Sequence, residues 1–143
     1  MIMCDFTALS PSQRSILLSK FYNILKTKGS VLLDMYSLNF FNRKHEQSLY
    51  EFNQLNKFWS KDDYYCFLNT FKYEEEKVLL DKYTIYSQGK KRVVYNWLQC
   101  FNQQSVINEF DDNNLTITEF FSNVSGDEFN SGSDEFAVIA QKK

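Results

Sequence analysis

The stretch MIMCDFTALSPSQRSILLSKFYNILKTKGSVLLDMY, residues 1–36, decides the predicted fold. An apolar run opens it, and a second apolar run returns over residues 31–36. Short apolar runs bounded by turn residues are typical of strands buried in a parallel sheet. The segment between them has the spacing of a helix. Residues 1–6 and 31–36 are therefore predicted to be parallel strands joined by a helix in a right-handed crossover.

The predicted helix has clear signals at both ends. Ser10 can cap the free amides, Pro11 suits the first helical position, and Gln13 completes a capping box with Ser10. Two lysines and then Gly29 follow the last apolar residues, a pattern typical of a helix carboxyl end. We expect the helix to run from about Pro11 to Thr27.

The period of the apolar residues changes at Phe58. Before it, residues 38–56 show a weak amphipathic pattern that we interpret as one or two helices. After it come three runs rich in aromatic and β-branched residues, at 64–72, 77–86 and 92–101. Such runs predict an antiparallel meander of about three strands. The aromatic residues of this region must be buried in a layer of their own or presented to a ligand.

The last part of the chain predicts a helix and a hairpin. Residues 103–110 have apolar side chains at helical spacing, and residues 115–123 alternate as in a strand. A polar loop with two glycines leads to the apolar run at 136–140. These two runs are expected to pair as an antiparallel hairpin.

Composition excludes several classes of function. The net charge is −2, and residues 90–92 form the only basic cluster, so we expect no nucleic-acid or membrane partner. No apolar run approaches the roughly 20 residues of a membrane span. Three separated cysteines fit reduced thiols, and His45 is the only histidine, so no metal site is expected. These features predict a soluble, cytoplasmic protein.

The order of the elements and several motifs resemble class I S-adenosylmethionine-dependent methyltransferases. The segment CDFTALSPSQR, residues 4–14, is similar to the end of the fourth strand and the start of the next helix in small-molecule members. The segment LKTKGSVLLD, residues 25–34, resembles the family's "LKPGG, strand, D" segment, with Thr27-Lys28 in place of proline and glycine. Residues 58–60, 95–101 and 137–142 resemble members that have a β-stranded substrate lid.

This resemblance implies an α/β fold, namely a partial Rossmann-like methyltransferase sheet with an antiparallel β lid insertion. The sheet would hold the last four strands of the family's fold and end in the antiparallel hairpin. Residues 1–143 would form one partial domain. Its three parts are the strand-helix-strand unit at 1–37, the lid insertion at 58–101, and the helix plus terminal hairpin at 103–143.

The resemblance also implies a site. Cys4, Asp5 and Phe6 would lie beside the methionine and sulfonium end of S-adenosylmethionine, and no catalytic residue is assigned. Five aromatic residues are predicted, by position and type, to form the substrate wall: Tyr36, Phe58, Trp59, Tyr95 and Trp97. The alternative is that each of these aromatic residues packs the lid onto the sheet.

The family's cofactor signature is absent from this chain. A glycine-rich loop lets backbone amides approach the cofactor, but the sequence contains no G-x-G, and its four glycines are widely separated. The leading hypothesis is therefore the substrate-side half of a methyltransferase for a small molecule, inactive alone. One alternative is a degenerate fragment that binds a ligand or partner, and another is a purely structural partner. The apolar edge at Met1–Cys4 predicts a homodimer or pairing with an amino-terminal half.

Overall fold

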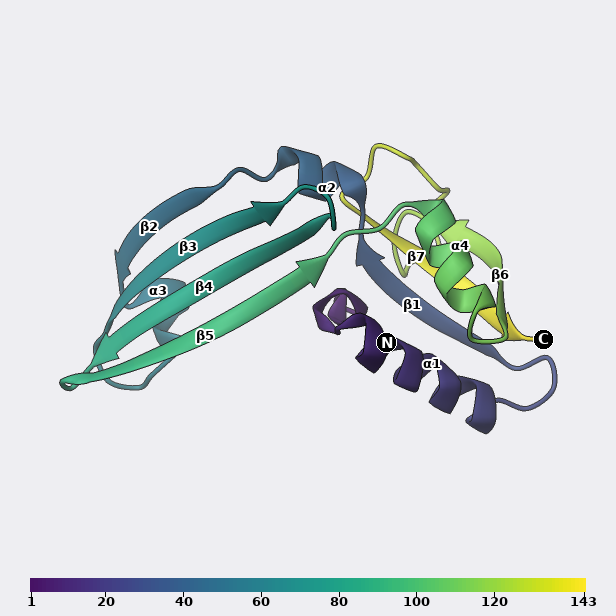
Figure 1. The fold of residues 1–143 in the computed structure, drawn as a ribbon, viewed down its shortest axis with the longest axis horizontal. Coiled ribbons are helices and arrows are strands. Elements are labelled where there is room, and N and C mark those ends of the chain that lie inside the picture. Colours follow the sequence, from purple (N-terminus) through teal and green to yellow (C-terminus); the bar gives the residue numbers. More distant parts are fainter.

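A computed structural model describes all of residues 1–143 and shows two separate antiparallel sheets (Figure 1). The elements in chain order are η1 (Asp5–Ala8), α1 (Pro11–Ile24), β1 (Ser30–Tyr36), α2 (Leu38–Arg43), β2 (Gln47–Phe52), α3 (Gln54–Lys57), β3 (Tyr65–Tyr73), β4 (Val78–Ser87), β5 (Lys90–Gln99), α4 (Gln103–Asp111), β6 (Leu115–Phe121) and β7 (Glu135–Lys142). One sheet has the order β1-β7-β6, and the other, which we name the lid sheet, has the order β2-β3-β4-β5.

The three-stranded sheet and the helices α1 and α4 form the core unit. Strand β7 is central and pairs antiparallel with β1 on one side and with β6 on the other. The predicted terminal hairpin is therefore confirmed, with a bulge between Ile117 and Glu119. Eleven buried residues make one cluster, to which α1 contributes Leu18 and α4 contributes Val106 and Phe110. This cluster is the main hydrophobic core of the chain.

The predicted first strand, residues 1–6, is wrong. Met3 and Cys4 have left-handed backbone conformations, with φ of 70° and 55°, and a 3-10 helix begins at Asp5. Only the amino group of Met1 reaches a main-chain oxygen of β1, that of Leu32, at 3.0 Å. A ladder needs a run of such bonds. The predicted parallel pair is therefore absent, and the sheet partner of β1 is the antiparallel strand β7.

Helix α1 begins as predicted and ends three residues earlier than expected. The capping box is present, with the Ser10 hydroxyl accepting from the Gln13 amide and the Gln13 side chain accepting from the Ser10 amide. Leu25 is already extended, so the chain leaves the helix before the lysines. A β-carbon at Gly29 would lie 2.8 Å from the carbonyl oxygen of Lys26. This close approach explains the glycine at the turn into β1.

The lid sheet contains four strands where the sequence predicted three. Helix α2 confirms part of the predicted helical region, but residues 47–52 form strand β2 along the edge of β3. Aromatic pairs across this edge, such as Tyr50 with Phe67 at 5.2 Å, explain why a short ambiguous segment becomes a strand. In α3, Leu55 and Asn56 have positive φ, so this segment is a left-handed turn rather than an extended helix.

The lid sheet leaves and rejoins the core unit at one point. Ser37, just after β1, forms a parallel bridge with Phe101, just before α4. The Phe101 amide donates to the Tyr36 carbonyl at 2.9 Å, and the Leu38 amide donates to the Phe101 carbonyl at 3.0 Å. The sheet projects away from this junction (Figure 1). It is therefore an insertion between β1 and α4.

None of the helices is both long and apolar enough to cross a lipid bilayer. No group of three or more His, Cys, Asp or Glu side chains is arranged to hold a metal ion.

Candidate functional site

Asp34 anchors the turn that precedes α1. It lies in β1 and is buried, and its two carboxylate oxygens accept from the amides of Met3 at 3.0 Å and Cys4 at 2.8 Å. The Thr7 hydroxyl closes the same turn by donating to the Cys4 carbonyl at 2.6 Å. Hydrogen bonds to a charged acceptor are stronger than neutral ones. Asp34 therefore holds residues 3 and 4 against β1.

The thiol of Cys4 lies in an acidic and buried environment. Its sulfur is 3.7 Å from a carboxylate oxygen of Glu135, and Asp34 is also near. Burial, followed by these two carboxylates, raises the pKa of the thiol far above its usual range. The group stays protonated and acts as a hydrogen-bond donor. It therefore lacks the thiolate that nucleophilic chemistry needs.

Tyr36 joins the same polar cluster from the end of β1. It lies opposite Glu135 in the register of the sheet and stacks on Phe40, with ring centroids 4.1 Å apart. Burial raises the pKa of its phenol, and the carboxylates of Glu135 and Asp34 add to this effect. The phenol therefore remains a neutral hydrogen-bonding group. The structure brings together Cys4 and Tyr36, two residues that the sequence assigned to the cofactor and the substrate.

Asp5 and Phe6 point to different surroundings. Asp5 is exposed at the start of η1, whereas Phe6 is fully buried in the core. The Phe6 ring lies 5.8 Å from Phe101 and 5.9 Å from Phe110. Phe6 thus packs α4 and the chain around Phe101 against the turn. Its predicted contact with the cofactor stays a prediction.

A cleft of about 240 Å³ lies between the start of α1 and the root of the lid sheet. Residues 7–11 with Gln13 and Arg14 form one wall, and Val78, Trp97 and Gln99 form the other. The cleft is smaller than the roughly 300–1,000 Å³ of typical small-molecule pockets. It lies beside the turn at Cys4, next to the residues predicted to contact the cofactor.

Arg14 ties the start of α1 to α4 and to Phe101, a role that sequence reasoning missed. Its guanidinium donates to Glu109 at 2.6 Å and to the Leu9 carbonyl at 2.7 Å, and it lies 5.1 Å from the centre of the Phe101 ring. The available signal was an arginine four residues before Leu18, on the apolar side of the helix. Asp34 could have been noticed in the same way, because it is an acidic residue inside a strand that was predicted to be buried.

The five predicted wall residues do not line one surface. Tyr95 and Trp97 project from one face of the lid sheet, because they pair with Lys82 and Leu80 in the register. Trp59 instead packs on Tyr83, with ring centroids 4.9 Å apart, on the opposite face. Phe58 stays next to Trp59 and is 70% exposed. Only Trp97 borders the cleft at the start of α1, and the substrate contacts of the others stay a prediction.

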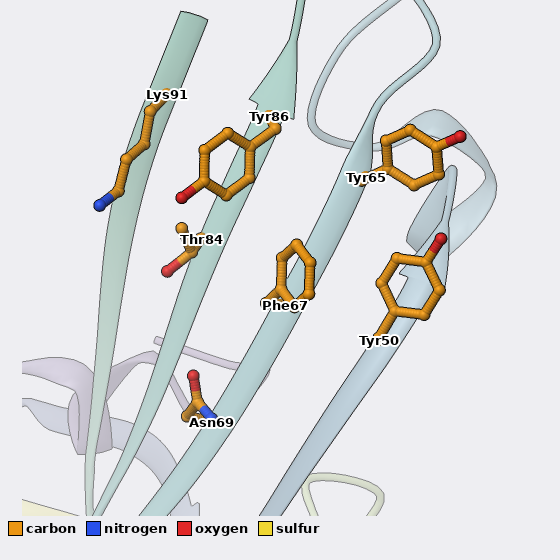
Figure 2. A pocket seen from close by; sticks show the side chains of 7 residues that line it. All are labelled: Tyr50, Tyr65, Phe67, Asn69, Thr84, Tyr86 and Lys91. Atoms are coloured by element: carbon orange, nitrogen blue, oxygen red, sulfur yellow. The ribbon is translucent and has the colours of Figure 1, made fainter.

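One face of the lid sheet carries nine exposed aromatic side chains, and we name it the aromatic face. The strand registers place the following residues on it: Tyr50, Phe52, Tyr65, Phe67, Phe71, Tyr73, Tyr86, Tyr95 and Trp97. A hollow of about 710 Å³ lies on this face. Figure 2 shows Tyr50, Phe67, Tyr86 and Lys91 among the side chains that line it. It is larger than the cleft and lies toward the far end of the lid sheet.

Solved structures of other proteins share the fold of this chain. No protein-family model and no curated protein matches the sequence. Among solved structures, the CcbJ methyltransferase from Streptomyces caelestis matches 99% of this chain and 58% of its own, with 10% identity and a TM-score of 0.70. An S-adenosylmethionine-dependent methyltransferase from Clostridium acetobutylicum matches 98% of this chain and 55% of its own, with 8% identity and a TM-score of 0.70.

A third similar structure contains the cofactor. CalS10, an amino pentose methyltransferase from Micromonospora echinaspora solved with S-adenosylmethionine, covers 99% of this chain and 56% of its own, with 8% identity and a TM-score of 0.53. This chain therefore spans little more than half the length of these proteins. The predicted fold class and the resemblance are confirmed at the level of the fold, and the chain has a partial S-adenosylmethionine-dependent methyltransferase fold.

Proposed function

We propose that this chain is the substrate-side half of an S-adenosylmethionine-dependent methyltransferase that acts on a small molecule. The observation that carries the proposal is the uneven coverage: nearly the whole chain matches only 58% of CcbJ. The matched part includes the turn at Cys4, the lid sheet and the terminal hairpin.

The free edge of β1 supports the need for a second half. Strand β1 lies at the edge of its sheet, because β7 occupies only one of its sides. Beside this edge, Ile2 and Met3 are largely exposed. An unpaired edge with apolar neighbours is a template for another strand. We therefore place the pairing with an amino-terminal half along β1, whereas the sequence placed it on Met1–Cys4.

This chain has too few free backbone amides to hold the cofactor. The amides of Met3 and Cys4 already donate to Asp34, so they are not free for a ligand. The sequence has no glycine-rich loop to supply others. When bound in a complete site, S-adenosylmethionine supplies the methyl group. What this chain offers is a wall of that site, formed by the turn at Cys4 and by Asp34, Glu135 and Tyr36.

The proposed part of this chain in the reaction is to bind and orient the substrate. Methyl transfer by direct displacement requires alignment of the acceptor and removal of water more than a covalent residue. Trp97 and Val78 can cover a substrate from above the start of α1, since they form one side of the cleft. The three free cysteines are buried, which supports the proposal of a reducing, cytoplasmic location.

Calorimetric titration of the chain with S-adenosylmethionine tests the half-enzyme proposal. A missing set of hydrogen bonds, each worth about 1–3 kcal/mol, is enough to remove a micromolar site of about 8 kcal/mol. We expect no binding at millimolar cofactor. Micromolar binding by this chain alone would contradict the proposal.

The second test adds the missing half. A polypeptide that supplies the neighbouring strand and the glycine-rich loop, if encoded upstream of Met1, should restore binding and turnover when mixed with this chain. Trp97→Ala should then reduce turnover at least about 10-fold while the complex still forms. Ile16→Ala, a change at an exposed position on α1, is the matched control and should leave turnover unchanged. Restored binding with no effect of Trp97→Ala would refute the role given to the lid.

A further inference from the structure

A pocket that the proposed function does not use lies at the tip of the lid sheet, and we name it the tip pocket. It has a volume of about 370 Å³, with Trp59, Ser60 and Asp62 on one side and the turn between β4 and β5 on the other. This turn is at the end of the lid sheet farthest from the core unit (Figure 1). The tip pocket shares no residue with the cleft at the start of α1. Its volume is within the range of small-molecule sites.

The basic cluster of the sequence lines the tip pocket. Lys90, Lys91 and Arg92 all border it, and none of them forms an ion pair with a carboxylate of the chain. Asp62 is the only acidic residue in the lining, so three positive charges and one negative charge leave a net charge of +2. The chain as a whole has a net charge of −2, so this excess of positive charge is local. Unpaired cations around a concave surface attract an anion.

The guanidinium of Arg92 is held in place by Trp59. It donates to the Trp59 carbonyl through Nη2 at 2.7 Å, and its central carbon lies 5.8 Å from the centre of the indole ring. This bond uses one of the guanidinium's five N–H groups, and the others are available to a ligand. An arginine that is already oriented loses less conformational entropy when it binds oxygen atoms as a fork.

The turn between β4 and β5 fixes a second cation beside Arg92. Gln88 and Gly89 have φ of 49° and 71°, the positive values of a tight two-residue hairpin turn. The turn pairs Ser87 with Lys90. Because Lys90 and Arg92 are two residues apart in β5, their side chains leave the same face of the sheet, about 6.6 Å apart along the strand. One anionic group can therefore contact both.

Two neutral donors add to these cations. The Ser60 hydroxyl accepts from the Asp62 amide at 3.1 Å, which leaves its own proton free to be donated. The indole N–H of Trp59 is buried and has no hydrogen-bond partner in the chain. A buried donor without a partner costs free energy, and a bound acceptor recovers it. The Ser87 hydroxyl is not free, because it donates to the Asp63 carbonyl at 3.0 Å.

We propose that the tip pocket binds the phosphate group of a small molecule. An arginine fork, a lysine and neutral donors are the groups that recognise phosphate oxygens. A phosphate monoester carries close to two negative charges at neutral pH, about −1.5 to −2, which matches the lining, whereas a carboxylate carries one. A single cluster of three cations offers few phosphate contacts to a nucleic acid, and it is smaller than the clusters of about four to eight that bind anionic membranes. The inference does not rest on methyl transfer.

Titration of the isotope-labelled full chain with pyrophosphate, followed by amide chemical shifts at constant ionic strength, tests the site. We expect saturable shifts confined to residues 59–62 and 85–92, with a Kd at or below about 1 mM. Inorganic phosphate should shift the same amides more weakly. Shifts that do not saturate by about 10 mM pyrophosphate, or that spread to exposed lysines elsewhere in the chain, would overturn the inference.

Arg92→Gln should weaken pyrophosphate binding at least about 10-fold, because the fork of charge-assisted hydrogen bonds is lost. Arg43→Gln is the matched control, since it removes the same charge at an exposed arginine that pairs with Asp134, and it should leave the affinity unchanged. Arg92→Lys keeps the charge without the fork, so its affinity should lie between those of the wild type and Arg92→Gln. The amide spectra show directly whether each variant is folded. Wild-type affinity in a folded Arg92→Gln would overturn the inference.

Two further measurements sharpen the identity of the ligand. Asp62→Asn should strengthen pyrophosphate binding about 2- to 5-fold, because it removes the carboxylate that repels the anion. Weaker binding in Asp62→Asn would contradict the arrangement. A short single-stranded RNA should bind no more tightly than pyrophosphate. RNA binding at least about 100-fold tighter would overturn the inference, because the basic cluster would then be part of a nucleic-acid surface.

Discussion

The core unit and the lid sheet use their aromatic residues in opposite ways. In the core unit, Phe6, Phe110 and Phe136 belong to one cluster of eleven buried residues. The lid sheet has two clusters of only three buried residues each, and its aromatic face remains exposed. Both regions are rich in apolar side chains, but the core unit buries them against helices, with Leu18 from α1 and Phe110 from α4 in its cluster. The comparison teaches that the core unit folds around its own interior, whereas the lid sheet leaves the aromatic residues of one face exposed.

The largest expected effect separates the two regions directly. Phe6→Ala should lower the free energy of unfolding by about 3–5 kcal/mol, because it leaves a cavity among Phe101, Phe110 and Arg14. Phe71→Ala, at a side chain that is 41% exposed, should cost less than about 1 kcal/mol. Urea denaturation measures both losses. Equal losses of stability in Phe6→Ala and Phe71→Ala would contradict the difference described between the core unit and the lid sheet.

A smaller effect is expected where the core unit holds the turn at Cys4. Asp34→Ala should cost about 2–3 kcal/mol, because the amides of Met3 and Cys4 lose a charged acceptor. Asp34→Asn, which keeps one acceptor oxygen, should cost less. Urea denaturation gives the free energies, and amide exchange at residues 3 and 4 should accelerate in both variants. Unchanged exchange at these two amides would show that Asp34 does not hold the turn.

Alkaline pH should destabilise both regions by up to about 1.4 kcal/mol per pH unit for each buried thiol. Burial raises the pKa of Cys4 and Cys66, and raises that of Cys100 to about 12. Above about pH 8.5, the ordinary thiol pKa, the unfolded chain releases protons that the folded chain keeps. The free energy of unfolding therefore falls as pH rises.

The alkaline effect of Cys4, in the core unit, should exceed that of Cys66, in the lid sheet. Carboxylates of Asp34 and Glu135 add to burial at Cys4, whereas only Glu51 does so at Cys66. Urea denaturation under reducing conditions between pH 7.5 and 10.5 should show a flatter decline for Cys4→Ala than for Cys66→Ala. A steeper decline for Cys4→Ala would contradict the environment described for this thiol.

The smallest effect is expected on the aromatic face. Tyr95→Ser should change the stability of the monomer by no more than about 0.5 kcal/mol, since Tyr95 is 55% exposed. The matched change Tyr64→Ser should cost more than about 3 kcal/mol, because Tyr64 is buried and its hydroxyl bonds the Gln54 carbonyl. Thermal unfolding of dilute samples compares the two. A large loss in Tyr95→Ser would mean that the aromatic face belongs to the lid sheet's own core.

The elements that could be predicted from the sequence are those with local causes. The start of α1 depends on Ser10, Pro11 and Gln13, which act within one helical turn. The alternation in β6 and the apolar run in β7 likewise lie within single strands, and the two strands are consecutive in the chain order. The methyltransferase fold rests on the order of such elements, so the resemblance also holds.

Only the tertiary structure decided the features that depend on distant partners. Residues 1–6 are apolar enough for a strand, but the Asp34 carboxylate takes the amides of Met3 and Cys4, and no ladder forms beside β1. Segment 47–52 becomes a strand because the edge of β3 supplies hydrogen bonds that its weak pattern does not reveal. Trp59 and Trp97 occupy opposite faces because their positions depend on packing and register, which composition does not encode. The Asp34 carboxylate, the edge of β3 and the register of the lid sheet each act between segments that are separate in the chain. Their effects therefore appear only when folding brings those segments together.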